Sequence, residues 1–158
     1  MSPPTVLVLG ATGFLGGHLL ELLNIRHPEL RLICLVRDPT PGKNAALKRL
    51  NSQVEILEGT LEDGDVISGA AGYVDAVIHI AHSDHVASVE AILRGLKRRT
   101  AKNSQKRPLY LHMSGLGIIA DNVRGEHVDD PKEWTDIGLR LDEYVLLLEE
   151  KPQPLTAT

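Results

Sequence analysis

Short apolar runs alternate along the chain with segments whose apolar residues recur at helical spacing. Five runs are rich in Val, Ile and Leu and lack the two-residue alternation of half-exposed strands. They predict strands at Thr5–Leu9, Arg31–Val36, Val54–Leu57, Ala76–Ala81 and Leu109–Met113. The helical spacing predicts helices at Gly13–Arg26, Lys43–Leu50, Glu62–Gly69, Asp84–Ala101 and Pro131–Glu150. This alternation is typical of α/β folds in which helices cover both faces of a parallel sheet.

We therefore predict a doubly wound parallel sheet of about five strands in the order 3-2-1-4-5. The predicted domain spans residues 1–150, and the Pro-containing residues 151–158 form a flexible tail. The fifth strand, Leu109–Met113, is then an apolar edge, because a doubly wound domain normally has six strands. This edge predicts a homo-oligomer formed through the fifth strand, or a chain shorter than its ancestor.

Composition narrows the classes of partner and the compartment. The 158 residues carry a formal net charge of -4, so the overall charge favours small-molecule or protein partners over nucleic acid. The lone Cys34 lies in an apolar run, which predicts a buried structural thiol and is compatible with a reducing compartment. The N-terminal residues lack a basic region, and glycines interrupt the apolar stretch behind them. We expect a cytoplasmic protein without a membrane segment.

A glycine motif joins the first predicted strand to the first predicted helix. It reads Gly10, Ala11, Thr12, Gly13, Phe14, Leu15 and Gly16. The first glycine permits a tight turn, the second lets backbone amides approach a pyrophosphate, and the third permits close packing of the helix on the strand. The amides and the dipole at the helix start favour phosphate binding. The motif therefore predicts a Rossmann-like domain that binds NAD or NADP through these seven residues.

The end of the second predicted strand bears on the choice between the two cofactors. Arg37 lies 21 residues beyond Gly16, at the position where an arginine accommodates the 2′-phosphate of NADP. An acidic residue there binds the ribose hydroxyl of NAD instead, and Asp38 follows directly. Arg37 favours NADP, and Asp38 leaves NAD open.

With these residues in place, the chain resembles the extended and atypical short-chain dehydrogenases/reductases, which include nucleotide-sugar epimerases and NmrA-like regulators. Its glycine motif is very close to that of the family. The stretch from Glu58 to Leu61 is similar to the family's Gly-Asp-Leu, so the resemblance places Thr60 and Leu61 beside the cofactor adenine, with a threonine replacing the usual aspartate. It also places Ala81, at the end of the fourth strand, beside the cofactor ribose.

The resemblance implies a catalytic serine at Ser114, because His112-Met-Ser114 is similar to the end of the family's fifth strand. In the family a Tyr-x-x-x-Lys pair follows. Here Tyr144 is followed by Leu148 at the lysine position, and a phenol of pKa near 10 without a neighbouring cation is a poor base at pH 7. Tyr144 is thus a weak catalytic candidate that also fits a packing role, and the family's C-terminal substrate-binding part has no counterpart.

Two further clusters have simpler explanations than a dedicated site. His79, His82 and His85 recur every three residues, but neighbouring strand side chains point to opposite faces, so we predict no metal site. His82 or Ser83 is instead predicted to contact the cofactor ribose or the substrate. Seven basic residues lie between Arg94 and Arg107, where a helix C-terminus favours cations and no aromatic residue is interleaved to stack bases.

Two functional hypotheses follow. The first is an NADP-binding oxidoreductase or epimerase-like protein that acts on a small carbonyl or hydroxyl substrate. The second is a non-catalytic NAD(P)-binding regulatory or scaffold module with a protein partner, indicated by Leu148 and by the absent substrate part. Apart from these two functions, the chain could be a fragment of a longer protein.

Overall fold

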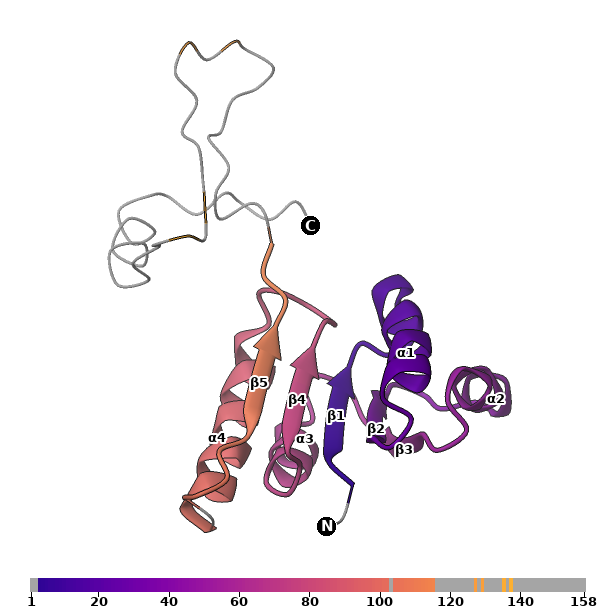
Figure 1. Cartoon of the computed structure of the whole chain (residues 1–158). Coiled ribbons are helices and arrows are strands. Elements are labelled where there is room, and N and C mark those ends of the chain that lie inside the picture. Colours follow the sequence, from indigo (N-terminus) through magenta and orange to yellow (C-terminus); the bar gives the residue numbers. More distant parts are fainter. Residues whose placement is uncertain are drawn as a thin grey trace. The chain divides into compact units, whose positions relative to one another are not determined.

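The structure is a computed structural model that describes residues 3–102, 104–115, 127, 129, 135 and 137. The chain divides into two compact units, Met1–Ser114 and Gly115–Thr158. All helices and strands described below belong to the first unit (Figure 1). In chain order they are β1 (Thr5–Leu9), α1 (Phe14–Arg26), β2 (Arg31–Val36), α2 (Pro41–Leu50), β3 (Glu55–Glu58), α3 (Gly64–Ala71), β4 (Ala76–His79), α4 (Val86–Lys102) and β5 (Leu109–His112).

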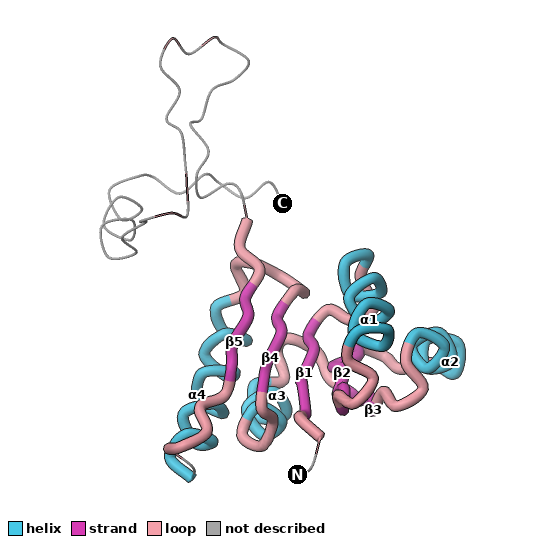
Figure 2. Tube along the Cα trace, in the orientation of Figure 1, coloured by secondary structure: helices cyan, strands magenta, loops and turns pink. Residues whose placement is uncertain are grey.

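The five strands form one parallel sheet in the order β3-β2-β1-β4-β5 (Figure 2). This confirms the predicted doubly wound α/β fold and its strand order. The order reverses between β1 and β4, and in such sheets ligands bind beside this reversal, outside the carboxyl ends of the strands. The glycine motif follows β1 and therefore begins at that point.

Side chains of alternate strand residues build a separate core on each face of the sheet. On one face Leu7 and Val77 pack with Ile67 of α3 and Ile92 of α4. On the other face the core is formed with α1 and α2, and it contains Val6, Val8, Leu20, Cys34 and Leu47. Burial raises the pKa of the Cys34 thiol to about 12, so it stays protonated, as expected of a structural cysteine.

Several predicted boundaries were wrong, and local side chains explain the differences. Helix α2 begins at Pro41 rather than Lys43 because Thr40 Oγ1 accepts a hydrogen bond from Lys43 N and caps the helix. Strand β4 ends at His79 rather than Ala81, since the chain turns where His82 Nδ1 accepts from Asp84 N at 3.0 Å. Shifts of one or two residues also change β3 to Glu55–Glu58, β5 to Leu109–His112, α1 to Phe14–Arg26, α3 to Gly64–Ala71 and α4 to Val86–Lys102.

The last predicted helix, Pro131–Glu150, lies outside the described residues apart from Thr135 and Ile137. The tail 151–158 also lies outside them, so the domain boundary at residue 150 stays a prediction. Of the helices in the described ranges, none has the length and apolar composition needed to cross a membrane.

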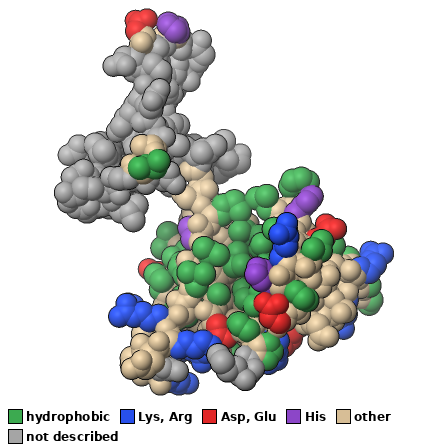
Figure 3. Space-filling model, in the orientation of Figure 1, with side chains coloured by type: hydrophobic (Ala, Val, Ile, Leu, Met, Phe, Trp, Pro, Cys, Tyr) green, Lys and Arg blue, Asp and Glu red, His purple; other side chains and the backbone are tan. Residues whose placement is uncertain are grey.

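Strand β5 is the last strand on its side of the described sheet. Tyr110 packs against the core formed with α3 and α4, so alternation places Leu109, Leu111 and Met113 on the opposite face. These three side chains are exposed, and Figure 3 shows hydrophobic side chains gathered over this part of the sheet. The exposed row agrees with an apolar edge, and oligomerisation through β5 stays a prediction.

Helices α3 and α4 approach each other closely at Gly95. A Cβ at Gly95 would lie 2.5 Å from Ser68 O and 2.6 Å from Ala71 Cβ, whereas a Cβ at Gly69 would meet nothing within 4 Å. We expect Gly95→Ala to lower the free energy of unfolding by about 2 kcal/mol through overpacking. Gly69→Ala should raise it by about 0.5 kcal/mol through helix propensity. Urea denaturation checks both, and a Gly95→Ala chain as stable as wild type would contradict the close approach.

Candidate functional site

The turn after β1 depends on a glycine at its first position. Gly10 has φ +97°, a left-handed conformation that L side chains rarely adopt. A Cβ there would also lie 2.7 Å from Ala81 N, so the turn fits closely against the chain that leaves β4. Gly13 N donates to Gly10 O at 3.0 Å and closes the turn one residue before α1 begins.

The other two glycines of the motif have different surroundings. Gly16 is buried, and a Cβ there would lie 2.1 Å from Gly10 O and 2.7 Å from Ala11 Cα. From the sequence we expected Gly16 to allow close packing of the helix on the strand. In the structure Gly16 instead approaches the turn that follows β1. Gly13 is exposed, and its Cβ would meet only Gly10 O, at 3.3 Å. Gly16 therefore maintains the shape of the turn, while Gly13 leaves its outer surface uncovered.

The start of α1 fits a pyrophosphate. Among the described residues, no side chain caps this helix, and its first turn has no acidic residue, so these residues place neither a competing hydrogen-bond acceptor nor a negative charge there. Thr12, Gly13, Phe14 and Leu15 are exposed around this end, while Ala11 is buried beneath it. Exposed amides at a positive helix end are the arrangement that binds phosphate groups.

The end of β2 gathers two cations. Arg37 directly follows the strand and is exposed, and Asp38 has φ +49°. Lys43 Nζ, from the first turn of α2, donates to Arg37 O and Asp38 O at 3.0 Å each. Lys43 was not among the residues predicted from the sequence, because a lysine early in a helix carries no local sign that it reaches back to a strand end.

Thr60 and Leu61 follow β3, and Gly59 N donates to Val36 O, which joins this segment to the end of β2. Thr60 N and Thr60 Oγ1 donate to Asp63 Oδ2 at 2.6 and 2.8 Å, and these bonds lower the pKa of Asp63. The hydroxyl hydrogen of Thr60 is therefore committed within the loop. Leu61 is half-buried and packs against the core. An adenine contact through either side chain stays a prediction.

Beyond β4, three histidines hold the loop that faces the glycine turn. His82 Nδ1 accepts from Asp84 N, and its exposed ring follows Ala81. His85 Nε2 lies 2.8 Å from Glu62 Oε1, and its Nδ1 accepts from Ser88 N at 3.2 Å. His112 of β5 donates a hydrogen bond from Nε2 to Ser83 O at 3.0 Å. These contacts give the loop a defined position beside Gly10.

His79, at the end of β4, is fully buried between β5 and α4. Its Nδ1 lies 3.1 Å from His112 Nδ1 with the two rings stacked, and its Nε2 lies 3.2 Å from Ser88 Oγ. Burial, and then the charges of His112, His85 and His82, lower its pKa to about 4. His79 is therefore buried while His82 is exposed, and because β4 ends at His79 this difference does not come from strand alternation.

The lowered pKa of His79 predicts a pH-dependent stability. The unfolded chain, with a histidine pKa near 6.5, binds this proton more tightly than the folded chain, so the contribution is complete above pH 6.5 and falls towards pH 4. We expect the free energy of unfolding to fall by about 3 kcal/mol between pH 7 and pH 4, relative to a His79→Phe chain that lacks the titrating ring. Urea denaturation at four pH values checks this, and parallel profiles for the two chains would contradict it.

The predicted catalytic pair is not assembled by the described residues. Ser114 is exposed, two residues beyond His112, and makes no hydrogen bond to any other residue of the described ranges. Tyr144 lies outside those ranges. The roles of Ser114 and Tyr144 stay predictions.

Much of the basic cluster on and after α4 serves the fold. Arg98 donates to Ser68 O and Ser68 Oγ at 2.7 and 2.9 Å. Arg99 and Lys106 pair with Asp75 at 2.9 and 2.8 Å, and Asp75 also accepts from Thr5 N. These bonds lower the pKa of Asp75 to about 2. The clustering thus has a structural explanation for these three cations.

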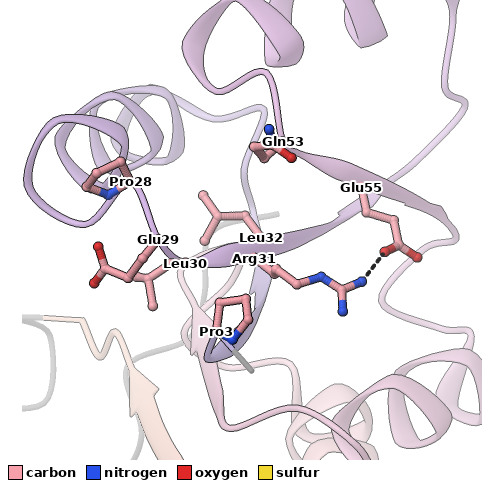
Figure 4. Close-up of a pocket in the computed structure, with 8 residues that line it drawn as sticks. All are labelled: Pro3, Pro28, Glu29, Leu30, Arg31, Leu32, Gln53 and Glu55. Atoms are coloured by element: carbon pink, nitrogen blue, oxygen red, sulfur yellow. Dashed lines mark ion pairs between the residues drawn. The ribbon is translucent and has the colours of Figure 1, made fainter. Parts of the chain in front are cut away.

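A cavity of about 400 Å³ lies at the opposite edge of the sheet (Figure 4). It is lined by the first residues of β2 and β3, with Arg31 and Glu55 paired at 3.7 Å, and by Pro3 ahead of β1. None of the predicted site residues lines this cavity. The candidate functional site is therefore separate from it and lies at the carboxyl ends of the strands.

Comparison with known proteins agrees with this geometry. The sequence profile of the NAD dependent epimerase/dehydratase family matches residues 6–103. An oxidase named ucsJ from Acremonium sp. is 36% identical over 140 residues, which cover 84% of this chain and 37% of that protein. The dTDP-glucose 4,6-dehydratase of Mycobacterium tuberculosis is 26% identical over 162 residues, covering 97% of this chain and 45% of the enzyme. The chain thus spans less than half the length of both relatives.

Among solved structures, the terminal R domain from the myxalamid PKS-NRPS biosynthetic pathway superposes with a TM-score of 0.58 at 22% identity. The match covers 84% of this chain and 40% of that domain, and it supports the same fold.

Proposed function

This chain belongs to the NAD dependent epimerase/dehydratase family, and from that premise we propose that Met1–Ser114 binds NADP as the cofactor domain of an oxidoreductase. The observation that carries the proposal is the turn from Gly10 to Gly16. It presents an uncapped helix end to solvent, and substituents at Gly10 and Gly16 would meet backbone at less than 3 Å. A turn of this shape accommodates a pyrophosphate and leaves no room for side chains at those two positions.

Two cations favour NADP over NAD. The exposed guanidinium of Arg37 offers a planar set of donors suited to a 2′-phosphate. Lys43, held to the carbonyls of Arg37 and Asp38, adds a second positive charge at the same strand end. Asp38, directly after Arg37, carries an opposing charge, so NAD is the alternative that calorimetric titration distinguishes.

Bound nicotinamide would supply the chemistry by giving or accepting a hydride. The residues of this chain would hold the pyrophosphate at the start of α1 and orient the dinucleotide along the carboxyl ends of β1 and β4. The hydroxyl of Ser114, exposed beyond β5, would hydrogen-bond the oxygen of a small carbonyl or hydroxyl substrate. This set positions the reacting groups, and proton transfer would need a further group.

A non-catalytic role is the second candidate, and the observation that favours it is Leu148. It stands where the family's pattern has the lysine that activates the tyrosine, which leaves Tyr144 without that cation. In this case the domain would bind NADP and transmit its presence to a protein partner. The two candidates share the cofactor site and differ only in turnover.

We further propose a cytoplasmic location. Cys34, the only cysteine of the chain, is a buried thiol, which is compatible with a reducing compartment.

Calorimetric titration of the purified chain with NADPH and with NADH at pH 7.5 tests the proposal. We expect NADPH to bind at least tenfold more tightly than NADH. A folded chain that binds neither nucleotide would refute the cofactor proposal. Turnover of NADPH with a panel of carbonyl substrates then separates the candidates, because binding without oxidation would favour the regulatory module.

A further inference from the structure

A continuous series of polar contacts begins and ends on the loop after β4 and passes through one side chain each of α4, β4 and β5. It begins at His85 O, which lies 2.9 Å from Ser88 Oγ, and continues from Ser88 Oγ to His79 Nε2 at 3.2 Å. It passes from His79 Nδ1 to His112 Nδ1 at 3.1 Å and ends where His112 Nε2 lies 3.0 Å from Ser83 O. Three side chains thus connect two backbone carbonyls through four contacts.

A count of the available hydrogens shows that this series of four contacts can accept one more proton. Both ends are carbonyl oxygens, which only accept, so four hydrogen bonds need four hydrogens from the three side chains between them. A serine hydroxyl supplies one, and each neutral imidazole supplies one, which makes three. In the neutral state one contact therefore brings two lone pairs together. One additional proton turns all four contacts into hydrogen bonds.

The surroundings decide which ring takes that proton. His79 is fully buried, and its pKa of about 4 keeps it neutral near pH 6. The ring of His112 is exposed on the edge strand and can donate from both nitrogens, to His79 Nδ1 and to Ser83 O. The hydroxyl of Tyr110, 3.1 Å from His112 Nδ1, can act as acceptor or donor and so does not oppose either state.

Other titratable groups also face the pair. His82 and His85 lie on the loop beyond β4, and their charges oppose a charge on His79. Glu62, from the segment before α3, places a carboxylate oxygen 2.8 Å from His85 Nε2. These groups reinforce the assignment of the proton to His112, which lies on the outer side of the pair.

The contact at Ser83 reaches the glycine turn within three residues. Ser83 follows Ala81 and His82, and the backbone of Ala81 is the wall that a Cβ on Gly10 would meet at 2.7 Å. Ile80 N is fixed to Leu9 O at 2.9 Å, so the loop has one anchor at β1 and a second at His112. Displacement of Ser83 would move the backbone of Ala81, which lies against the glycine turn.

We propose that protonated His112 is a positioning residue of the dinucleotide site, which holds Ser83 and thereby keeps Ala81 against the glycine turn. This inference rests on the proposed function, because it assigns a role at the same site. Protonated His112 donates a charge-assisted hydrogen bond to Ser83 O, which is stronger than the bond that a neutral ring donates, so we expect the protonated form to favour dinucleotide binding. His112 acts through the loop and does not itself touch the reacting atoms.

The binding test compares wild type with His112→Gln, whose amide can still donate to Ser83 but cannot take up a proton. The ligand is NADP⁺, which tolerates mild acid, and its own titration cancels in the comparison. At pH 6.0 we expect the variant to bind about fivefold more weakly than wild type, and at pH 8.5 equally well. The control His27→Gln removes an exposed histidine of α1's C-terminal end and should follow wild type at both pH values. Equal affinities of His112→Gln and wild type at pH 6.0 would overturn the inference.

A second measurement needs no nucleotide. Nitrogen-15 NMR of the histidine rings in the full chain at pH 6.0 should find His112 protonated on both nitrogens and His79 protonated on Nε2 alone. A neutral His112 at that pH, or a hydrogen on Nδ1 of His79, would overturn the proton assignment. If the rings behave as expected but no chain binds NADP⁺, the proposed function fails and the positioning role fails with it. If wild type binds and only the pH difference is absent, the positioning role alone fails.

Discussion

Replacing Gly16 with alanine is expected to weaken NADPH binding at least about 100-fold and to destabilise the fold by about 3 kcal/mol. The added Cβ would lie 2.1 Å from Gly10 O and 2.7 Å from Ala11, and both neighbours are backbone atoms that cannot rotate away. The turn would have to open, which would displace the amides at the start of α1. Calorimetric titration and urea denaturation of the same preparation measure the two effects.

Gly17→Ala is the matched control, because it adds the same methyl group one residue further along the helix. Its Cβ would meet only Leu50 Cδ1, at 3.9 Å, which is ordinary contact. We expect this variant to bind NADPH like wild type and to be slightly more stable, since alanine favours a helix. Equal effects of the two substitutions would show that helix composition, and not the geometry of the turn, governs binding.

Replacing Arg37 with alanine is expected to weaken NADPH binding about 30-fold while changing NADH binding by less than about twofold. A guanidinium that donates charge-assisted hydrogen bonds to a phosphate contributes roughly 2 kcal/mol, and NADH lacks the 2′-phosphate. Arg37 is exposed directly after β2 and is not needed for the core, so the variant should fold normally. Titration with both nucleotides at one ionic strength measures the selectivity.

Arg26→Ala is the control for charge, because Arg26 is also exposed but ends α1. It should leave both affinities unchanged. A parallel loss of NADPH and NADH binding in Arg37→Ala would mean that the arginine supports the loop and not the 2′-phosphate. In that case Lys43, which already holds two carbonyls of this loop, would be the remaining cation for selectivity.

Much of the fold could be predicted from local patterns of apolar and polar residues. The strands β1 and β2 are continuous apolar runs, and such runs are recognisable because a strand buried on both faces has no polar side to interrupt the pattern. The boundaries were less predictable, as at Thr40, whose capping hydroxyl moved the start of α2 by two residues.

The glycine turn was also recognisable, because its requirements are local. A tight turn, an exposed helix start and a close contact within seven residues all leave their mark on consecutive positions, from Gly10 to Gly16. The position of Arg37 at the end of β2 could be predicted for the same reason, since its distance from the motif is set by one helix and one strand, and its contact with a 2′-phosphate stays a prediction.

The class of sheet, the strand order and the glycine turn could therefore be predicted from sequence alone. Which distant side chains meet depends on the tertiary structure. His79 and His112 are 33 residues apart and face each other only because β4 and β5 pair in parallel register. Gly95 matters only because α3 and α4 cross there, and Lys43 only because α2 turns back towards the end of β2. Such contacts depend on the register and packing of whole elements, and no short stretch of residues encodes them.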